Sequence, residues 1–409
     1  MLLRAYQPDR DAPAVKRIWR EVGWIDSPEN ERAMDVFLQG TRSRVAVVRD
    51  APECMVNATP ATLRYLAEDI PQCCITGVTT SRIARKQGIA SRLAADVLAR
   101  EAEGGAEAAT LGIFDQGFYN QLGFGNGPYV HWCTFDPSRL IDLPRARVPV
   151  RLGQDDWEPI HAGRMSRLRV HGGTTLLPAE ATRAEMLWST NGFGLGYRDA
   201  DGRVTHHVWL SAKNVEDGPY RVAWMSYQTR DECLELFALL RALGDQVLSI
   251  RMQEPVGIQL QDLLIQPFRS RRLTEKSPHE NRMRASAYWQ IRILDLEGCL
   301  SRNSLPSCKT RFNLILTDPI EAYLPDDVAW RGLSGSYLVS LGRSCTIDER
   351  TDPALPTMKA SINAFSRLWL GVRCATSLSW TDDLSGPPQL LAELDLALGV
   401  PSPYNDWDF

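Results

Sequence analysis

A glycine and two cations at the start of a predicted helix are the residues of this chain best suited to chemistry. The sequence Arg85-Lys86-Gln87-Gly88-Ile89-Ala90 follows an apolar run, Cys73–Val78, that predicts a buried strand, with Thr79–Arg85 as a connecting loop. A helix N-terminus offers free N–H groups and the positive end of the helix dipole, and a glycine there leaves room for an anion. The segment therefore predicts a phosphate cradle, with an ordinary helix start as the alternative.

A second motif follows one further predicted strand, Ala108–Phe114. The sequence there reads Phe118-Tyr119-Asn120-Gln121-Leu122-Gly123-Phe124. Together, R-x-x-G-x-A after a strand and this later F-Y-x-x-L-G-F resemble the acyl-coenzyme A binding core of the GNAT superfamily of N-acetyltransferases. The resemblance implies that two neighbouring parallel strands part and that the pantetheine and thioester of the donor enter the gap.

The resemblance also assigns roles to residues around both motifs. Tyr119 is expected to be the general acid that protonates the departing thiolate, which a phenol of pKa near 10 can do for a thiol of pKa near 8.5. A core tyrosine with a locally satisfied hydroxyl is the alternative. The residues expected to bind acetyl-coenzyme A (acetyl-CoA), the co-substrate, are Val78, Thr79, Thr80, Arg85, Lys86, Gly88, Ile89 and Ala90.

Composition narrows the remaining possibilities. A chain of 409 residues is too long for one core and predicts two or three domains. Nine cysteines without a C-x-x-C pair and six histidines without metal spacing predict neither a disulfide framework nor a metal site. A net charge of −4 argues against nucleic acid as a partner.

The chain shows no sign of membrane insertion or export. No stretch approaches the roughly twenty apolar residues of a membrane span. The segment Met1–Ala12 lacks the apolar centre of a signal peptide. These features predict a cytoplasmic protein without a membrane partner.

The order of predicted elements divides the chain into three units of an α/β (α+β) fold. Residues 1–146 form the unit with both motifs, and a proline-containing linker follows. Residues 147–287 repeat the mixed α/β order but read Thr229-Arg230-Asp231-Glu232 where the cradle would lie. Without a glycine, and with carboxylates at the helix start, this unit is expected to be a catalytically silent copy. Residues 288–409 resemble the sterol carrier protein fold.

Three units in this order resemble the enhanced intracellular survival (Eis) family of acetyltransferases. The family resemblance implies two tandem GNAT domains, a sterol-carrier-like third domain and a large homo-oligomer, a hexamer. It also implies that the terminal residue, here Phe409, brings its free α-carboxylate into the first domain to serve the amine substrate. The alternative is a tail that only packs its aromatic side chains.

The carboxylate of Phe409 is expected to orient the amine rather than to act as a strong base. An α-carboxyl group has an ordinary pKa near 3.5, far below that of an amine. Trp24, Asp26 and Asp408 are further candidates for a pocket that binds a cationic substrate, with solvated surface carboxylates as the alternative for the two acids.

The predicted function is acetyl-CoA-dependent N-acetylation of primary amines of a cationic small molecule, with aminoglycosides as the family example. Direct attack on the thioester is expected, because Cys73 and Cys74 lie on a buried strand and not beside a base. Two alternatives stay open: a non-catalytic carrier of acyl-CoA or lipid, and a transferase that uses a longer acyl donor, as tandem-domain N-myristoyltransferases do.

Overall fold

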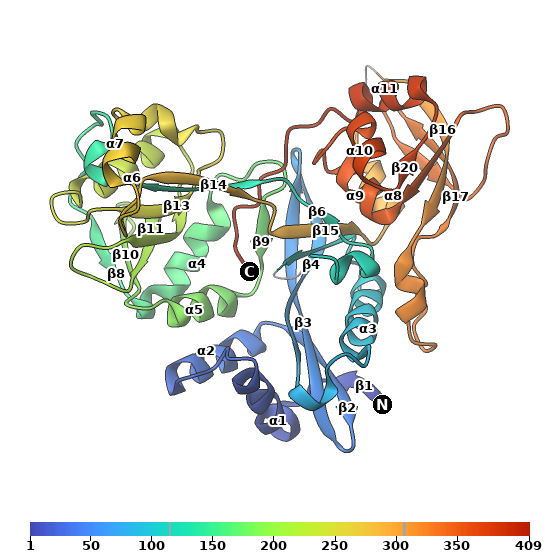
Figure 1. Ribbon diagram of the computed structural model, residues 1–409, viewed down its shortest axis with the longest axis horizontal. Helices are drawn as coiled ribbons and strands as arrows, with labels where there is room; N and C mark the ends of the chain where they lie inside the picture. The colour runs from blue at the N-terminus through green and yellow to red at the C-terminus, as the bar shows by residue number, and fades with distance from the viewer. Residues whose placement is uncertain (114–115, 306–307) are drawn as a thin grey trace.

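The computed structural model describes residues 1–113, 116–305 and 308–409 of a mixed α/β protein. Three β-sheets lie in a row, each with helices packed against it (Figure 1). The described part of the chain contains no helix that is both long and apolar enough to cross a membrane.

The central sheet carries both sequence motifs. Its strands, in spatial order, are β1 (Leu2–Ala5), β2 (Arg42–Val48), β3 (Ala51–Tyr65), β4 (Glu68–Thr80), β5 (Ala108–Gly112), β15 (Trp289–Ile293) and β6 (Gly125–Asn126), with β9 (Thr174–Leu176) also paired to β3. All pairs are antiparallel except β4 and β5, which run parallel. The helices that belong to this region are α1 (Pro8–Glu21), α2 (Pro28–Gln39) and α3 (Ile89–Glu103).

Helix α3 connects the two parallel strands, as a crossover between parallel strands requires. Its apolar residues Leu93, Val97 and Leu98 are almost fully buried against the sheet. The predicted loop Thr79–Arg85 is shorter than expected, since β4 runs to Thr80 and Arg82–Ala84 form a 3₁₀ turn. The predicted strand Ala108–Phe114 is observed over Ala108–Gly112, and Phe114 lies outside the described residues.

The second sheet lies on one side of the central one (Figure 1). Its strands, in spatial order, are β14 (Arg282–Ser286), β7 (Val130–Phe135), β13 (Ile250–Gln253), β12 (Tyr220–Ser226), β11 (Val204–Ala212), β10 (Phe193–Arg198) and β8 (Val150–Leu152). Its helices are α4 (Trp157–Ser166), α5 (Ala179–Trp188), α6 (Arg230–Ala242) and α7 (Pro267–Thr274). Helix α5 packs on α2 of the first region.

The third sheet lies on the opposite side. Its strands are β18 (Thr346–Asp348), β17 (Gly335–Leu341), β16 (Thr310–Thr317), β19 (Thr357–Ser361) and β20 (Leu384–Ser385). Its helices are α8 (Leu296–Ser301), α9 (Ile362–Trp369), α10 (Ala375–Thr381) and α11 (Pro388–Ala397).

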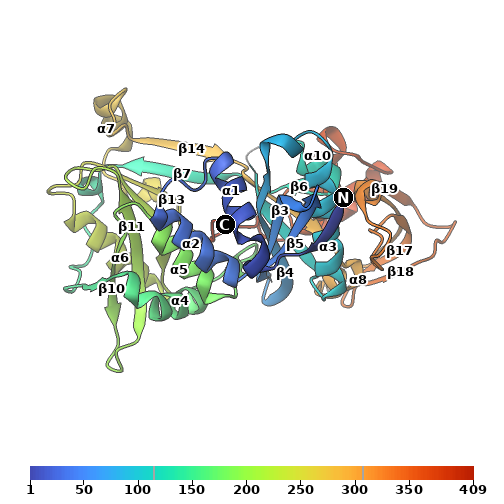
Figure 2. The same ribbon diagram turned by 90° about the horizontal axis from the view of Figure 1, so that it is seen from below.

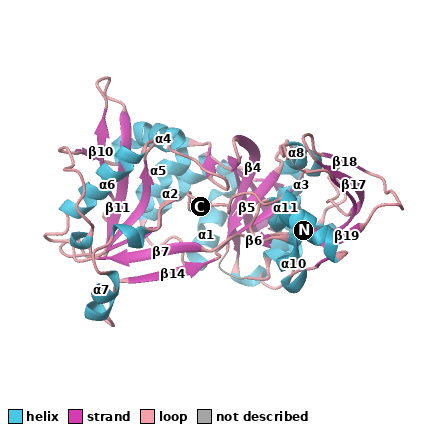
Figure 3. Ribbon diagram, turned by 90° about the horizontal axis from the view of Figure 1, so that it is seen from above, coloured by secondary structure: helices cyan, strands magenta, loops and turns pink. Residues whose placement is uncertain are grey.

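Two strands cross the predicted divisions at residues 146 and 287. Strand β7, before the first division, pairs with β13 and β14 in the second sheet. Strand β15, after the second division, pairs with β5 in the central sheet. Figures 2 and 3 show β7 and β14 side by side, reaching from the second sheet toward the centre. The units of the sequence are therefore joined by shared sheets as well as by linkers.

Candidate active site

The two parallel strands of the central sheet part where the chemistry is predicted. Strands β4 and β5 pair from Gln72 and Ala108 as far as Ile75 and Leu111, and no later pair forms between them in the described residues. Beyond that point β4 continues to Thr80 beside β3 alone, with a bulge in the β3–β4 pairing. Gly77 sits at this bulge with a φ of +57°. A Cβ there would lie 2.1 Å from Nδ2 of Asn57, so the bulge requires glycine.

The predicted phosphate cradle opens α3. Gly88 is the N-cap residue, with a φ of 71°, and a Cβ placed on it would meet no atom within 4 Å. There is therefore open space beside Gly88 at the helix start, where the first-turn N–H groups have no partner within the helix. Arg85 and Lys86 are exposed, and among the described residues neither forms an ion pair. Their charge is available to an anionic ligand.

The second unit differs at the corresponding helix start. The carboxylate of Glu232 accepts hydrogen bonds from the backbone N–H groups of Gln228 at 2.7 Å and of Thr229 at 3.2 Å. One of the carboxylates at this helix start, that of Glu232, therefore caps the helix. In contrast to α3, the start of α6 thus carries a negative charge of the chain itself, which disfavours an anion there.

One cavity of about 590 Å³ gathers the residues predicted for the acetyl donor. Its lining includes all eight residues predicted to bind acetyl-CoA, together with Tyr119 and Trp24. Sequence reasoning missed four further lining residues, namely Val22, Ala84, Ser91 and Phe118. Helical phase relative to Gly88 could have indicated Ser91, which lies one turn into α3.

Tyr119 is held from several sides. It begins a short 3₁₀ helix, Tyr119–Leu122, that ends at Gly123 with a φ of +83°. Its ring lies edge-on to Phe118, with centroids 4.9 Å apart, and the residue is 5% exposed. Arg292, fully buried and paired with Asp318 at 2.6 Å, donates to the carbonyl oxygen of Leu122. Packing and this buried ion pair therefore position the turn that carries the phenol.

The two predicted substrate acids lie outside this cavity. Asp26 is exposed and accepts a hydrogen bond from the Asn30 side chain at 2.6 Å. Asp408 pairs with Arg221 at 3.1 Å and lines a separate cavity beside α5 and β12. The structure thus brings Trp24, but neither acid, to the predicted donor site.

The chain end reaches the central sheet. In Figure 1 the C-terminus lies between α4 and α5 on one side and β3 on the other. A Cβ built on Gly112, the last residue of β5, would lie 3.1 Å from the backbone oxygen of Phe409. The terminal residue therefore lies against β5 at the place where that strand has separated from β4.

The two cysteines of β4 are unsuited to nucleophilic attack. Cys73 and Cys74 are fully buried. Burial raises the pKa of Cys74 to about 12 and that of Cys73 well above its ordinary value. Both groups are therefore thiols near neutral pH.

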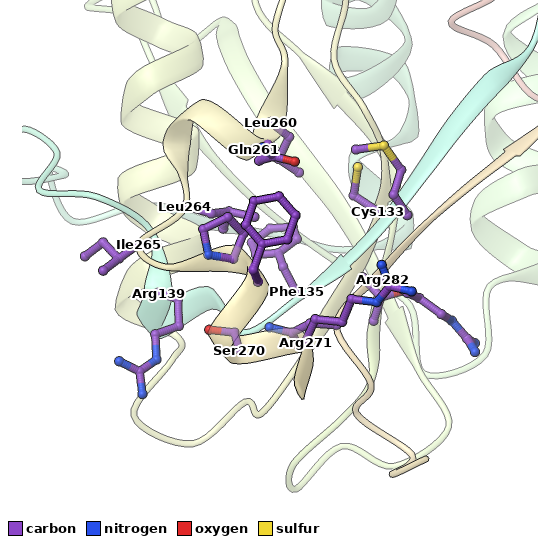
Figure 4. A pocket seen from close by; sticks show the side chains of 15 residues that line it. Cys133, Phe135, Arg139, Leu260, Gln261, Leu264, Ile265, Ser270, Arg271 and Arg282 are labelled. Carbon is purple, nitrogen blue, oxygen red and sulfur yellow. The ribbon is translucent and has the colours of Figure 1, made fainter. Parts of the chain in front are cut away.

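A smaller cavity of about 110 Å³ lies beneath α7 on the second sheet (Figure 4). Its floor is apolar, with Cys133 and Phe135, and Arg139, Arg271 and Arg282 surround it. It contains no acid, base or nucleophile in a catalytic pairing. In the described residues no group of three or more His, Cys, Asp or Glu side chains could hold a metal ion.

Comparison with known proteins places the fold. No protein-family model matches this sequence, and no match is found among curated proteins. Solved structures match over the full chain. A conserved protein of unknown function from Enterococcus faecalis V583, described as a probable N-acyltransferase, has a TM-score of 0.80 at 18% identity, covering 100% of this chain and 99% of its own. A GCN5-related N-acetyltransferase from Kribbella flavida has a TM-score of 0.73 at 18% identity, covering 100% and 98%.

The chain therefore shares the overall fold of these two solved structures along its whole length. In particular it shares this fold with Eis1 from Mycobacterium abscessus, at a TM-score of 0.76 and 15% identity, covering 100% of both chains.

Proposed function

We propose that this chain is an acetyl-CoA-dependent N-acetyltransferase that acts on primary amines of cationic small molecules, aminoglycosides among them. The observation that carries the proposal is the one cavity that collects the start of α3, the free stretch of β4 and Tyr119. These are a cradle for a pyrophosphate, an unpaired strand edge for an amide chain and a proton donor for a thiolate.

The donor is bound by backbone groups and two cations. The N–H groups of Gly88 and Ala90 hold the pyrophosphate, and Arg85 and Lys86 add charge. Beyond Ile75, backbone groups at Val78 and Thr80 have lost their β5 neighbour, so they are available to the pantetheine amides. This pairing would place the thioester between the two strands.

The acetyl group passes directly from sulfur to nitrogen. The neutral amine attacks the thioester carbonyl carbon, a C–N bond forms, and the C–S bond breaks. Tyr119 gives its proton to the departing sulfur, and the proton that the attacking nitrogen loses passes through water to the phenolate, so the products are an acetamide and coenzyme A thiol. The high pKa values of Cys73 and Cys74 support direct attack without an acyl-enzyme.

The α-carboxylate of Phe409 is the group proposed for the acceptor. Its position against Gly112 supports contact with an amine that approaches the parted strands. An α-carboxyl group ordinarily has a pKa near 3.5, so its carboxylate is a weak base. It is better suited to orient the substrate ammonium, whose proton then passes to water, than to take up that proton itself. Trp24, which lines the donor cavity, is proposed to contact the acceptor, whereas Asp408 pairs with Arg221 in a separate cavity and is not part of this surface.

Thiol release from acetyl-CoA tests the function. The purified protein is assayed with aminoglycosides, polyamines, lysine derivatives and basic peptides, with donors of increasing acyl length in parallel. Amine-dependent release with acetyl-CoA supports the proposal and identifies the acceptor class. Acetyl-CoA binding without release for any amine would favour a carrier, and preference for long chains would favour an acyltransferase of another class.

A further inference from the structure

The side chains that hold the chain end in place belong to the second unit, residues 147–287, which lacks the phosphate cradle. Arg167, the residue after α4, is 7% exposed. Its Nε and Nη2 donate to the two carboxylate oxygens of Asp406 at 2.7 and 2.8 Å. The same guanidinium also donates to the carbonyl oxygens of Arg164 at 2.7 Å and Thr174 at 2.6 Å. Arg167 is thus held on two sides and fixes both oxygens of Asp406.

The next tail residue is enclosed by a second set of contacts. The indole of Trp407 is 1% exposed, and its Nε1 donates to Glu185 at 2.7 Å. The guanidinium of Arg164 lies 3.5 Å from the centroid of the Trp407 ring and pairs with Glu185 at 2.7 Å. The Cζ of Arg164 also lies 4.1 Å from the centroid of the Trp224 ring. Each of these three side chains, Trp407, Glu185 and Arg164, therefore contacts the other two.

These anchors restrict the terminal carboxylate. Only Asp408 and Phe409 follow Trp407, and two residues span at most about 7 Å. A free tail would instead sample a large volume, and only a small part of its population would be in place. Burying two arginines costs desolvation free energy, which an apolar contact would not. In return, a bidentate ion pair and a stacked guanidinium fix the orientation of the tail, which an apolar contact does less well.

We propose that Arg164 and Arg167 are positioning residues that hold the α-carboxylate of Phe409 beside the acetyl-transfer site. The middle unit then contributes to the reaction by anchoring the chain end. This inference rests on the proposed function of Phe409. The inference gives the second unit, residues 147–287, a role in catalysis that does not require this unit to bind a coenzyme.

The test compares Asp406→Asn in the full chain and in a chain that lacks Phe409. Asp406→Asn keeps the side-chain shape and removes the charge that orients Arg167. In the full chain kcat for the amine should fall by about tenfold or more, since a misplacement near 1 Å costs about 100-fold, while KM for acetyl-CoA stays unchanged. In the shortened chain the same substitution should have no further effect. An equal fall in both backgrounds would overturn the inference, because it would indicate a general structural role.

Glu235→Gln is the matched control. Glu235 also forms a bidentate pair, with Arg147 at 2.9 and 2.7 Å, in the same unit. The Glu235→Gln variant should leave kcat unchanged in both backgrounds. A fall in kcat as large as that of Asp406→Asn would contradict the positioning role.

A second measurement does not depend on acetyl transfer. Carboxypeptidase should release Phe409 and Asp408 slowly from the original chain and several times faster from the Asp406→Asn variant, with equal melting temperatures before digestion. Equal release rates would overturn the anchoring. Absence of thiol release from the original chain with every amine would count against the proposed function alone.

Discussion

Substitution of the glycine at the start of α3 should affect both the stability of the protein and its binding of acetyl-CoA, and a second glycine allows the two effects to be distinguished. Gly88 and Gly105 lie at opposite ends of the helix, with φ values of +71° and +91°, and a Cβ on either would meet no atom within 4 Å. Alanine in this left-handed conformation costs about 1–2 kcal/mol. Both Gly88→Ala and Gly105→Ala should therefore lose about the same free energy of unfolding.

Only Gly88 lines the donor cavity. A methyl group there occupies the space that a phosphate oxygen needs to accept hydrogen bonds from the helix start. Loss of one charge-assisted hydrogen bond costs about 1.5–3 kcal/mol, which is about 10- to 150-fold in KM for acetyl-CoA. Gly105→Ala should leave this KM unchanged.

The assay combines chemical denaturation with saturation kinetics in acetyl-CoA for both variants. A KM that rises equally in both would show that helix strain, and not the cradle, is responsible. An unchanged KM in Gly88→Ala would refute phosphate binding at this helix start.

Three further perturbations follow from the same geometry. Tyr119→Phe should lower kcat by about 100-fold with little change in the Kd of acetyl-CoA; unchanged turnover in a steady-state assay would remove the proton-donor role. Arg85→Ala and Lys86→Ala should each raise KM for acetyl-CoA about 1.5- to 5-fold and weaken its salt dependence, whereas a salt response equal to that of the original chain would contradict their contact with phosphate. Burial lowers the pKa of His207 from 6.5 to about 3, so the unfolded chain binds the proton more readily. The stability that neutral His207 provides is therefore complete above pH 6.5 and declines as the pH falls toward about 3. His207→Gln should flatten this slope in denaturation curves, and an unchanged slope would rule His207 out as its cause.

Local patterns predicted the strand and helix that line the proposed donor cavity. The segment Arg85–Ala90 predicted a helix start after a buried strand, and α3 begins directly after Gly88. The predicted donor residues are near one another in the chain, so local strand and helix geometry suffices to bring them together. Tyr119 joined them through the family resemblance, and the cavity that holds all of them agrees with it.

Long-range pairing could not be predicted from the same patterns. Strand β15 reads as the start of the last unit, yet it pairs with β5, far back in the sequence. An alternating apolar strand specifies which face is buried but not which partner it has. For the same reason Arg167 gave no signal in the sequence, because its partner, Asp406, lies in the chain end and is brought near only by tertiary packing.

The position of Asp26 differs from the one predicted. Asp26 was expected to contribute negative charge to a pocket for a cationic substrate, but Trp24 lines the cavity while Asp26 is exposed and accepts a hydrogen bond from Asn30. Although only Ile25 separates the two residues, just one of them lines the cavity, so proximity in sequence does not place both side chains in one pocket.

A crystal structure with coenzyme A bound tests the central claim most directly. The account predicts the pyrophosphate against the N–H groups of Gly88 and Ala90, the pantetheine along Val78–Thr80, and the sulfur within hydrogen-bond reach of the Tyr119 hydroxyl. Coenzyme A bound in another cavity, or a sulfur remote from Tyr119, would contradict it.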